Sequence, residues 1–151
     1  MLKTKIPPPV YMLMMAGWMW SLDRYFPVYH WLDSPWNRVG LVIVGASILL
    51  DVWSLLLFFS VKTTPNPMNP DNTRHLVTTG LYRISRNPMY LGLLVMLTGW
   101  ALYLGSVSPL SALPLFVWIL TRQQIEPEEM ILADKFGQQY EDYKRRVRRW
   151  I

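Results

Sequence analysis

The chain has 151 residues, of which 52% are hydrophobic, 14% aromatic and only 17% charged. The apolar residues fall into long runs separated by short polar segments, a pattern typical of membrane proteins and not of a soluble core. The net charge of +5 comes from basic residues that flank these runs, which favours contact with anionic lipid over nucleic acid. Cysteine is absent, which excludes disulfides, thiolate metal sites and cysteine nucleophiles.

Four apolar runs approach the length of about 20 residues that a membrane-spanning helix needs. The predicted spans are Val10–Phe26, Val39–Val61, Met89–Leu104 and Leu110–Ile125. Only Gly105–Pro109 separates the last two, which predicts a tight helical hairpin. Pro114 is expected to kink the fourth helix. Gly92 and Gly99 share one face of the third helix, where small residues allow close packing. Asp51, inside the second span, needs a partner or a cavity, and both binding and helix packing remain open for it.

Lys and Arg residues predict the orientation of these helices. With four spans, 13 of the 15 fall on one side of the membrane. The positive-inside rule then places both termini and the second loop in the cytoplasm. No small-residue cleavage pattern follows the first apolar run, so we expect it to be retained. The small size and the lack of cysteine favour a prokaryotic inner membrane.

The polar tail is also predicted to be helical. Pro127 suits a first helical turn and Gly137 suits a helix end. Tyr140, Tyr143, Val147 and Trp150 then recur at helical spacing with basic residues between them, which predicts an interfacial amphipathic helix, with the basic run 144–149 on the lipid surface. The expected fold is thus a single all-α integral membrane domain. It comprises two N-terminal spans (1–61), a cytoplasmic loop (62–87), a helical hairpin (88–125) and an amphipathic tail (126–151).

Two cytoplasmic segments hold nearly all the polar residues that could do chemistry. They are His75–Tyr90 and Arg122–Tyr143, and the hairpin joins them, so we expect them to close one pocket at the membrane interface. Metal-ligand spacing is absent, because His30 and His75 are far apart and predicted on opposite sides of the membrane. The sequence also has no dinucleotide-binding glycine fingerprint and no P-loop.

These two segments resemble a known family. The run GLYRISRNPMYLG, from Gly80 to Gly92, resembles the GPYxxxRHPxYxG signature of isoprenylcysteine carboxyl methyltransferases and their phospholipid methyltransferase relatives. The tail EEMILADKFGQQYEDYKRRV, from Glu128 to Val147, resembles that family's EExxLxxxFGxxYxxYxxxV. Both blocks stand in the family's order, and with their flanks they cover about half of the chain.

The resemblance implies an enzyme that binds S-adenosylmethionine at the membrane edge and methylates a lipophilic acceptor. One wall of the cofactor site would consist of Leu76, Val77, Gly80, Tyr82, Arg83, Arg86, Asn87, Pro88 and Tyr90. The opposite wall would consist of Glu128, Glu129 and Tyr140. A carboxylate can bind the cofactor's amino group or a ribose hydroxyl, and an arginine can bind its carboxylate.

Two residues are candidates for catalysis, depending on the acceptor. Methyl transfer mainly requires that the nucleophile be positioned and desolvated. A carboxylate acceptor, such as a prenylcysteine, needs only an orienting cation, for which Arg122 is the candidate. A lipid amine must lose a proton, and Glu129 or a tyrosine is then the candidate acceptor of that proton. Phospholipid amines, prenylcysteine carboxylates and small hydrophobic thiols or amines all remain open.

One departure from the family pattern keeps other functions open. Asn87 replaces the family's histidine, and an amide cannot titrate near neutral pH. An NADPH-dependent membrane reductase of the sterol reductase type is one alternative, although the acidic tail suits its extra phosphate poorly. A non-enzymatic membrane scaffold is the other. Cofactor binding separates the three.

Overall fold

The computed structural model describes residues 6–60 and 76–151, in which the regular secondary structure is helical apart from one isolated β-bridge between His30 and Ser106. The predicted loop 63–72, His75 and four of the basic residues counted above lie outside this range. The main helices are α1 (Pro8–Tyr25), α2 (Val39–Ser60), α3 (Pro88–Leu104), α4 (Ala112–Leu120), α5 (Glu126–Phe136) and α6 (Gln138–Arg146). Short 3-10 turns occupy Trp36–Arg38, Gly80–Arg83 and Ser108–Ser111.

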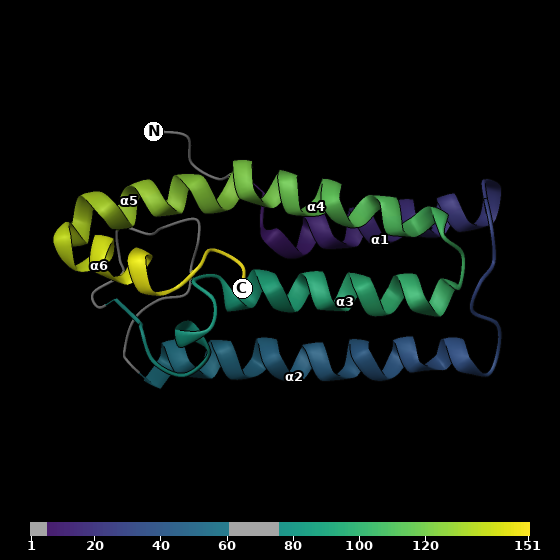
Figure 1. The fold of residues 1–151 in the computed structure, drawn as a ribbon, viewed down its shortest axis with the longest axis horizontal. Coiled ribbons are helices and arrows are strands. Elements are labelled where there is room, and N and C mark those ends of the chain that lie inside the picture. Colours follow the sequence, from purple (N-terminus) through teal and green to yellow (C-terminus); the bar gives the residue numbers. More distant parts are fainter. Residues whose placement is uncertain (1–5, 61–75) are drawn as a thin grey trace.

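The first three predicted spans coincide with α1, α2 and α3 to within two residues at the ends described. The fourth differs, because the helix predicted to end at Ile125 continues beyond it. After α4 the chain stays helical through a π-helical turn, Thr121–Ile125, and runs directly into α5 (Figure 1). Pro114 is the third residue of α4, where backbone N–H groups have no intrahelical acceptor. Pro114 therefore removes no hydrogen bond from the interior of α4, so the physical reason for the predicted kink is absent.

Helix α3 lies between the other long helices. The main hydrophobic core is formed where α3 meets α1 and α4, around Met19, Leu97 and Phe116, which are fully buried. On its other side α3 packs closely against α2, because Gly99 and Gly92 leave room for the backbone of Gly40 and the side chain of Asp51. This confirms the predicted role of the two α3 glycines in close packing.

The two ends of the bundle differ in character. At one end α3 stops at Gly105, whose positive φ of 82° ends the helix, and the following turn is hydrogen-bonded to the α1–α2 connection through Trp31 and Tyr29. At the other end lie α5, α6, the C-terminus and the start of α3 (Figure 1). The turns that join α1 to α2 and α3 to α4 are therefore separated by the length of the bundle from the segments that carry the two sequence blocks.

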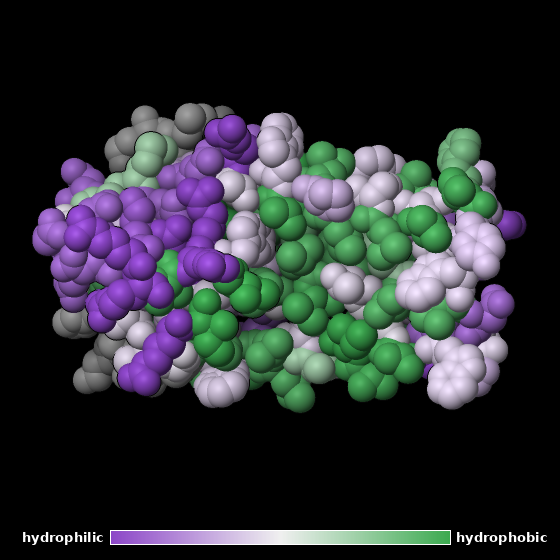
Figure 2. Space-filling view, viewed as in Figure 1, coloured by the Kyte–Doolittle hydropathy of each residue, from purple (hydrophilic) through white to green (hydrophobic). Residues whose placement is uncertain are grey.

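The surface follows the same division. Figure 2 shows a hydrophilic end over α5 and α6, an apolar middle, and pale aromatic residues at the opposite end. Large apolar side chains are exposed along α1 and α2, among them Leu13, Met14, Val42, Leu49 and Leu56. By length and composition, one helix in the described part, Trp36–Leu56, is long and apolar enough to cross a membrane, and α3 is a shorter apolar helix. An exposed apolar surface of this kind is typical of a contact with a membrane or with another protein.

The structure corrects the predicted interfacial face of the tail. Tyr140 and Tyr143 are 2% and 4% exposed, and with Val147 they form a second core cluster against Val77 and Tyr82. The aromatic stripe thus faces the Gly80–Arg83 turn and not lipid. Helical spacing shows that a stripe is apolar but not whether protein or lipid covers it, which is why the interpretation was wrong.

Candidate functional site

The two sequence blocks meet through the last residues of the chain. The backbone N–H of Arg86 donates to the carbonyl of Arg148 (3.0 Å), and the Asn87 amide donates to the carbonyl of Arg149 (3.0 Å). The buried hydroxyl of Ser85 donates to the same carbonyl (3.4 Å) and accepts the backbone N–H of Asn87 (3.0 Å). Asn87 occupies the N-cap position of α3 but makes no side-chain capping bond, because its amide binds the C-terminal segment instead.

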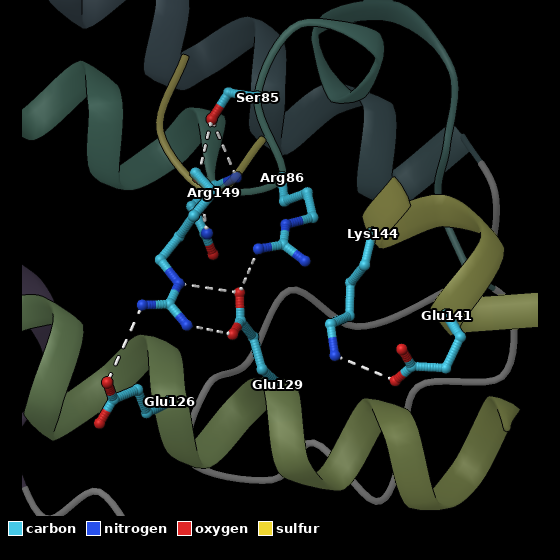
Figure 3. Close-up of polar contacts among 8 residues, drawn as sticks. Ser85, Arg86, Glu126, Glu129, Glu141, Lys144 and Arg149 are labelled. Carbon is cyan, nitrogen blue, oxygen red and sulfur yellow. Dashed lines mark hydrogen bonds and ion pairs between the residues drawn. The ribbon is translucent and has the colours of Figure 1, made fainter. Parts of the chain in front are cut away.

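A carboxylate shared by two arginines lies where these segments join α5 (Figure 3). Glu129 accepts bonds from both the Nε (3.1 Å) and the Nη2 (2.6 Å) of Arg149, and it forms an ion pair with Nη2 of Arg86 (2.9 Å). The side chains of Arg86 and Glu129 are only 10% and 13% exposed. Charge-assisted, two-point contacts of this kind are short and fix the orientation of both groups.

Arg86 keeps unused hydrogen-bonding capacity in this cluster. Its Nε and Nη1 are buried and have no hydrogen-bond partner among the described residues. Buried guanidinium donors without an acceptor are costly. Nε–H and Nη1–H point to opposite sides of the guanidinium group, so each needs its own acceptor, and the carboxylate of a ligand can supply one of them.

Glu128 provides a second acidic group of different character. Its carboxylate accepts the hydroxyl of Tyr90, on α3, at 2.7 Å. Burial raises the pKa of Glu128 to about 7, the Tyr90 hydrogen bond opposes this shift, and the charge of Glu129 adds to it. Two adjacent carboxyl groups therefore have different surroundings: Glu129 is paired with two arginines, whereas burial brings the pKa of Glu128 near neutral pH.

The buried tyrosines brace this site. The hydroxyl of Tyr143 donates to the backbone carbonyl of Tyr82 (2.7 Å) and so ties α6 to the Gly80–Arg83 turn. Burial raises the pKa of Tyr140 and of Tyr143 above the usual value for a phenol. Both phenols therefore remain protonated at neutral pH, which disfavours a tyrosine as the acceptor of a substrate proton.

Most of the predicted site residues are brought together. Those that lie at this junction are Leu76, Val77, Tyr82, Arg86, Asn87, Pro88, Tyr90, Glu128, Glu129 and Tyr140. Three lie at its edge or beyond it. Gly80 and Arg83 are exposed on the turn. Arg122 has a side chain 61% exposed and forms an ion pair with Glu126 (3.1 Å) in the π-helical turn.

Sequence reasoning missed two residues of the site. Arg149 was grouped with the basic run on the lipid surface, yet it binds Glu129 and also lies 3.8 Å from Glu126. Ser85 was not singled out, although it connects the motif to the C-terminal segment. No local pattern distinguishes Arg149 from Arg148, because the partner of Arg149 lies 20 residues earlier, on α5.

Comparisons with known proteins agree with the two blocks. A family model described as phospholipid methyltransferase matches residues 36–139, more than half of the chain. Protein-S-isoprenylcysteine O-methyltransferase A of Arabidopsis thaliana is 35% identical over 118 residues, which cover 78% of this chain and 58% of that protein. A probable protein-S-isoprenylcysteine O-methyltransferase of Oryza sativa subsp. japonica is 32% identical over 111 residues, covering 74% and 58%.

A shorter relative matches over its full length. It is an uncharacterized protein of Haemophilus influenzae, 41% identical over 63 residues, which make up 42% of this chain and the whole of that protein. The methyltransferase relatives, in contrast, are matched over little more than half of their length. No solved structure matches the chain significantly. The matching family model and these relatives place the chain in the phospholipid methyltransferase family, beside the isoprenylcysteine O-methyltransferases.

Proposed function

We propose that the protein is an integral membrane methyltransferase that transfers a methyl group from S-adenosylmethionine to a lipophilic acceptor. The observation that supports this most directly is the cluster at the junction of the two family blocks. There, a buried arginine with unused donors lies beside one carboxyl group that is paired with arginines and one whose pKa lies near neutral pH. Family membership supplies the reaction class, and the cluster supplies groups of the right charge.

The residues present fit the amino-acid part of this cofactor, which carries a carboxylate and an ammonium group. One of the two free donors of Arg86, Nε or Nη1, would bind the carboxylate, and the Glu128 carboxylate would bind the ammonium group. When bound, the cofactor supplies a methyl group made electrophilic by its sulfonium. The protein's own contribution is to hold the acceptor in line and to exclude water.

The catalytic roles follow from the different surroundings of the two carboxyl groups. Glu129 is held by Arg86 and Arg149, so it is suited to positioning these arginines. For an amine acceptor Glu128, with its raised pKa, is better suited to accept the proton, and this role is an alternative to binding the cofactor's ammonium group. Arg122 remains a candidate for orienting a carboxylate acceptor only if the acceptor's head group reaches the outer side of the π-helical turn.

The same proposal includes a membrane arrangement. Four helices, α1 to α4, cross the bilayer, with the hydrophilic end that carries α5 and α6 in the cytoplasm, and the membrane is a prokaryotic inner membrane. The exposed apolar middle and the aromatic end of the bundle support it. The acceptor would reach the site sideways from lipid. A prenylcysteine-like carboxylate and a lipid amine both fit at this level, and the named relatives favour the first.

Binding of S-adenosylhomocysteine, the reaction product, tests the proposal directly. Isothermal titration of detergent-purified protein should give a dissociation constant in the micromolar range. Arg86→Gln should weaken binding by about tenfold or more, because charged hydrogen bonds are lost. Arg145→Gln is the matched control, since Arg145 is exposed on α6 and its ion pair with Asp142 is long, at 4.0 Å. This variant should bind the ligand like the wild type.

Two results would contradict the proposal. Folded wild-type protein that does not bind S-adenosylhomocysteine would exclude the methyltransferase, and binding of NADPH by the same preparation would then identify a reductase. Equal weakening by Arg86→Gln and Arg145→Gln would show that the ligand responds to overall charge and not to this cluster.

A further inference from the structure

The turn between α4 and α5 buries one long polar side chain. Gln124, in the π-helical turn Thr121–Ile125, is 0% exposed, whereas the side chain of its neighbour Gln123 is exposed. Glutamine is mostly found at protein surfaces, and a buried amide needs hydrogen-bond partners for both its nitrogen and its oxygen. Turns of the π type are frequent at functional sites. The partners of the Gln124 amide therefore indicate what this turn does.

One half of the Gln124 amide has a partner and the other half has none. Its Nε2 donates to the backbone carbonyl of Ile6 (2.8 Å), in the segment that leads into α1. Its Oε1 is buried and has no hydrogen-bond partner among the described residues, which costs about 1–3 kcal/mol for a polar group. The amide cannot reverse, because its oxygen would then face the carbonyl of Ile6, and two acceptors repel. Oε1 is thus held in place as an unused acceptor.

This acceptor lies one helical turn from the acidic part of the candidate site. Gln124 precedes Glu128 by four residues in a continuous helix, and side chains at this spacing share a face. Glu128 binds the hydroxyl of Tyr90 on α3, and Ile125, next to Gln124, packs in the same core cluster as Tyr90. Gln124 therefore faces the site together with Glu128, although it stands outside both family blocks.

An ammonium group is the part of the proposed cofactor that needs such an acceptor. It has three N–H donors, and one of the Glu128 oxygens already accepts the Tyr90 hydroxyl. The two arginines of the cluster are donors only. Of the buried side-chain acceptors without a partner in the described part of the chain, Gln124 Oε1 is the one in the helix that carries Glu128. An amide oxygen attracts a cation without adding a further charge to the site.

We propose that Gln124 is a cofactor-binding residue whose Oε1 accepts a hydrogen bond from the ammonium group of S-adenosylmethionine. This inference rests on the proposed function and adds a residue to its site. The carbonyl of Ile6 fixes the orientation of the amide, so the segment that leads into α1 helps to position the cofactor. A neutral acceptor also stays in place when Glu128 takes up a proton, so the ammonium group keeps a partner in either state of Glu128.

Two ligands that differ only in the amino group test this contact without requiring turnover. S-adenosylhomocysteine and its deamino analogue, in which hydrogen replaces the amino group, would be titrated into the purified full-length protein in detergent. Gln124→Leu should weaken binding of S-adenosylhomocysteine by about tenfold, because a hydrogen bond to a charged group is lost. Binding of the deamino analogue should not change, since this ligand cannot make the bond. Gln124→Met, which matches glutamine in length, should give the same result.

Gln123 provides the matched control. Gln123→Leu makes the same chemical change at the exposed neighbouring position, and this variant should bind both ligands like the wild type. Binding of the deamino analogue by the Gln124 variants also shows that they are folded, so a selective loss of S-adenosylhomocysteine reports the contact and not the stability of the helix junction.

The outcomes distinguish this inference from the function on which it rests. Equal weakening or loss of both ligands in the two Gln124 variants would show that Gln124 only holds the helix junction. Unchanged binding of S-adenosylhomocysteine in these variants, or equal affinity of the wild type for the two ligands, would show that Oε1 does not bind the ammonium group. Each of these results overturns the inference and leaves the methyltransferase proposal intact. Folded wild-type protein that binds neither ligand would overturn both.

Discussion

Two glutamates three residues apart on α5 differ in what they contribute. Glu129 is 13% exposed and binds Arg86 and Arg149 at 2.6–3.1 Å. Glu126 is 34% exposed and binds Arg122 at 3.1 Å, while Arg149 is 3.8 Å away. Removing one partner of a buried ion pair leaves an uncompensated charge, whereas an exposed pair is screened by solvent.

We therefore expect Glu129→Gln to destabilise the protein far more than Glu126→Gln. The cost at Glu129 should be about 3 kcal/mol, the lower end for a buried pair, since Arg149 is partly exposed, and that at Glu126 below about 1 kcal/mol. For a chain of this size about 3 kcal/mol corresponds to a fall of roughly 6 °C or more in the thermal midpoint. Thermal unfolding of both variants in detergent measures the difference. Similar midpoints would show that the Arg86–Glu129–Arg149 cluster does not hold the tail to the motif.

At the scale of elements, the π-helical turn between α4 and α5 has an identifiable cause. Pro127 has no N–H, and its ring would clash with the carbonyl of Gln123 in a regular helix. Instead the chain widens over Thr121–Ile125, and the N–H of Glu126 bonds back to Thr121. One extra residue in a turn rotates everything that follows by about 100°, which changes the face on which Glu128 and Glu129 lie.

This turn also shows how far the sequence could be interpreted. Apolar length and flanking charge predict α1, α2 and α3 within two residues, and the tight hairpin brings the two motif blocks together as expected. The sequence did not reveal that α4 and α5 are continuous, because a proline after an apolar run indicates a new helix as readily as a widened one. Pairings such as Arg149 with Glu129 depend on how α5 is rotated about its own axis. No local sequence pattern specifies that rotation.

Close contact between α2 and α3 gives a prediction at the same scale. A Cβ at Gly99 would lie 2.6 Å from the carbonyl oxygen of Gly40 and 3.0 Å from Val44, whereas one at Gly45 would meet nothing within 4 Å. Gly99→Ala should therefore push the helices apart and lower the thermal midpoint. Gly45→Ala should leave it unchanged or raise it slightly, since alanine favours the helix by up to about 1 kcal/mol. A lower midpoint for Gly45→Ala than for Gly99→Ala would contradict the observed helix contact.

For the molecule as a whole, the distribution of polarity determines how it can sit in a bilayer. The acidic and basic residues of α5 and α6 gather at one end, and exposed aromatic residues such as Tyr29, Trp31 and Trp36 lie at the other, beside the turns. Tyrosine and tryptophan favour membrane–water interfaces, and lysine and arginine favour the cytoplasmic side. The aromatic residues fit an interface on either side, so it is the basic residues that favour the proposed orientation, with the end that carries α5 and α6 in the cytoplasm.

The absence of cysteine makes this orientation directly measurable, because any single introduced cysteine is the only thiol. Asp134 is exposed on α5, and Tyr29 is 65% exposed in the α1–α2 connection. In intact bacterial cells a membrane-impermeant maleimide should label Tyr29→Cys and not Asp134→Cys, and in inside-out vesicles the pattern should reverse. Labelling of both from one side would mean that α1 to α4 do not form four spans. The opposite pattern would place the arginine–glutamate cluster outside the cell, where the proposed cofactor is not supplied.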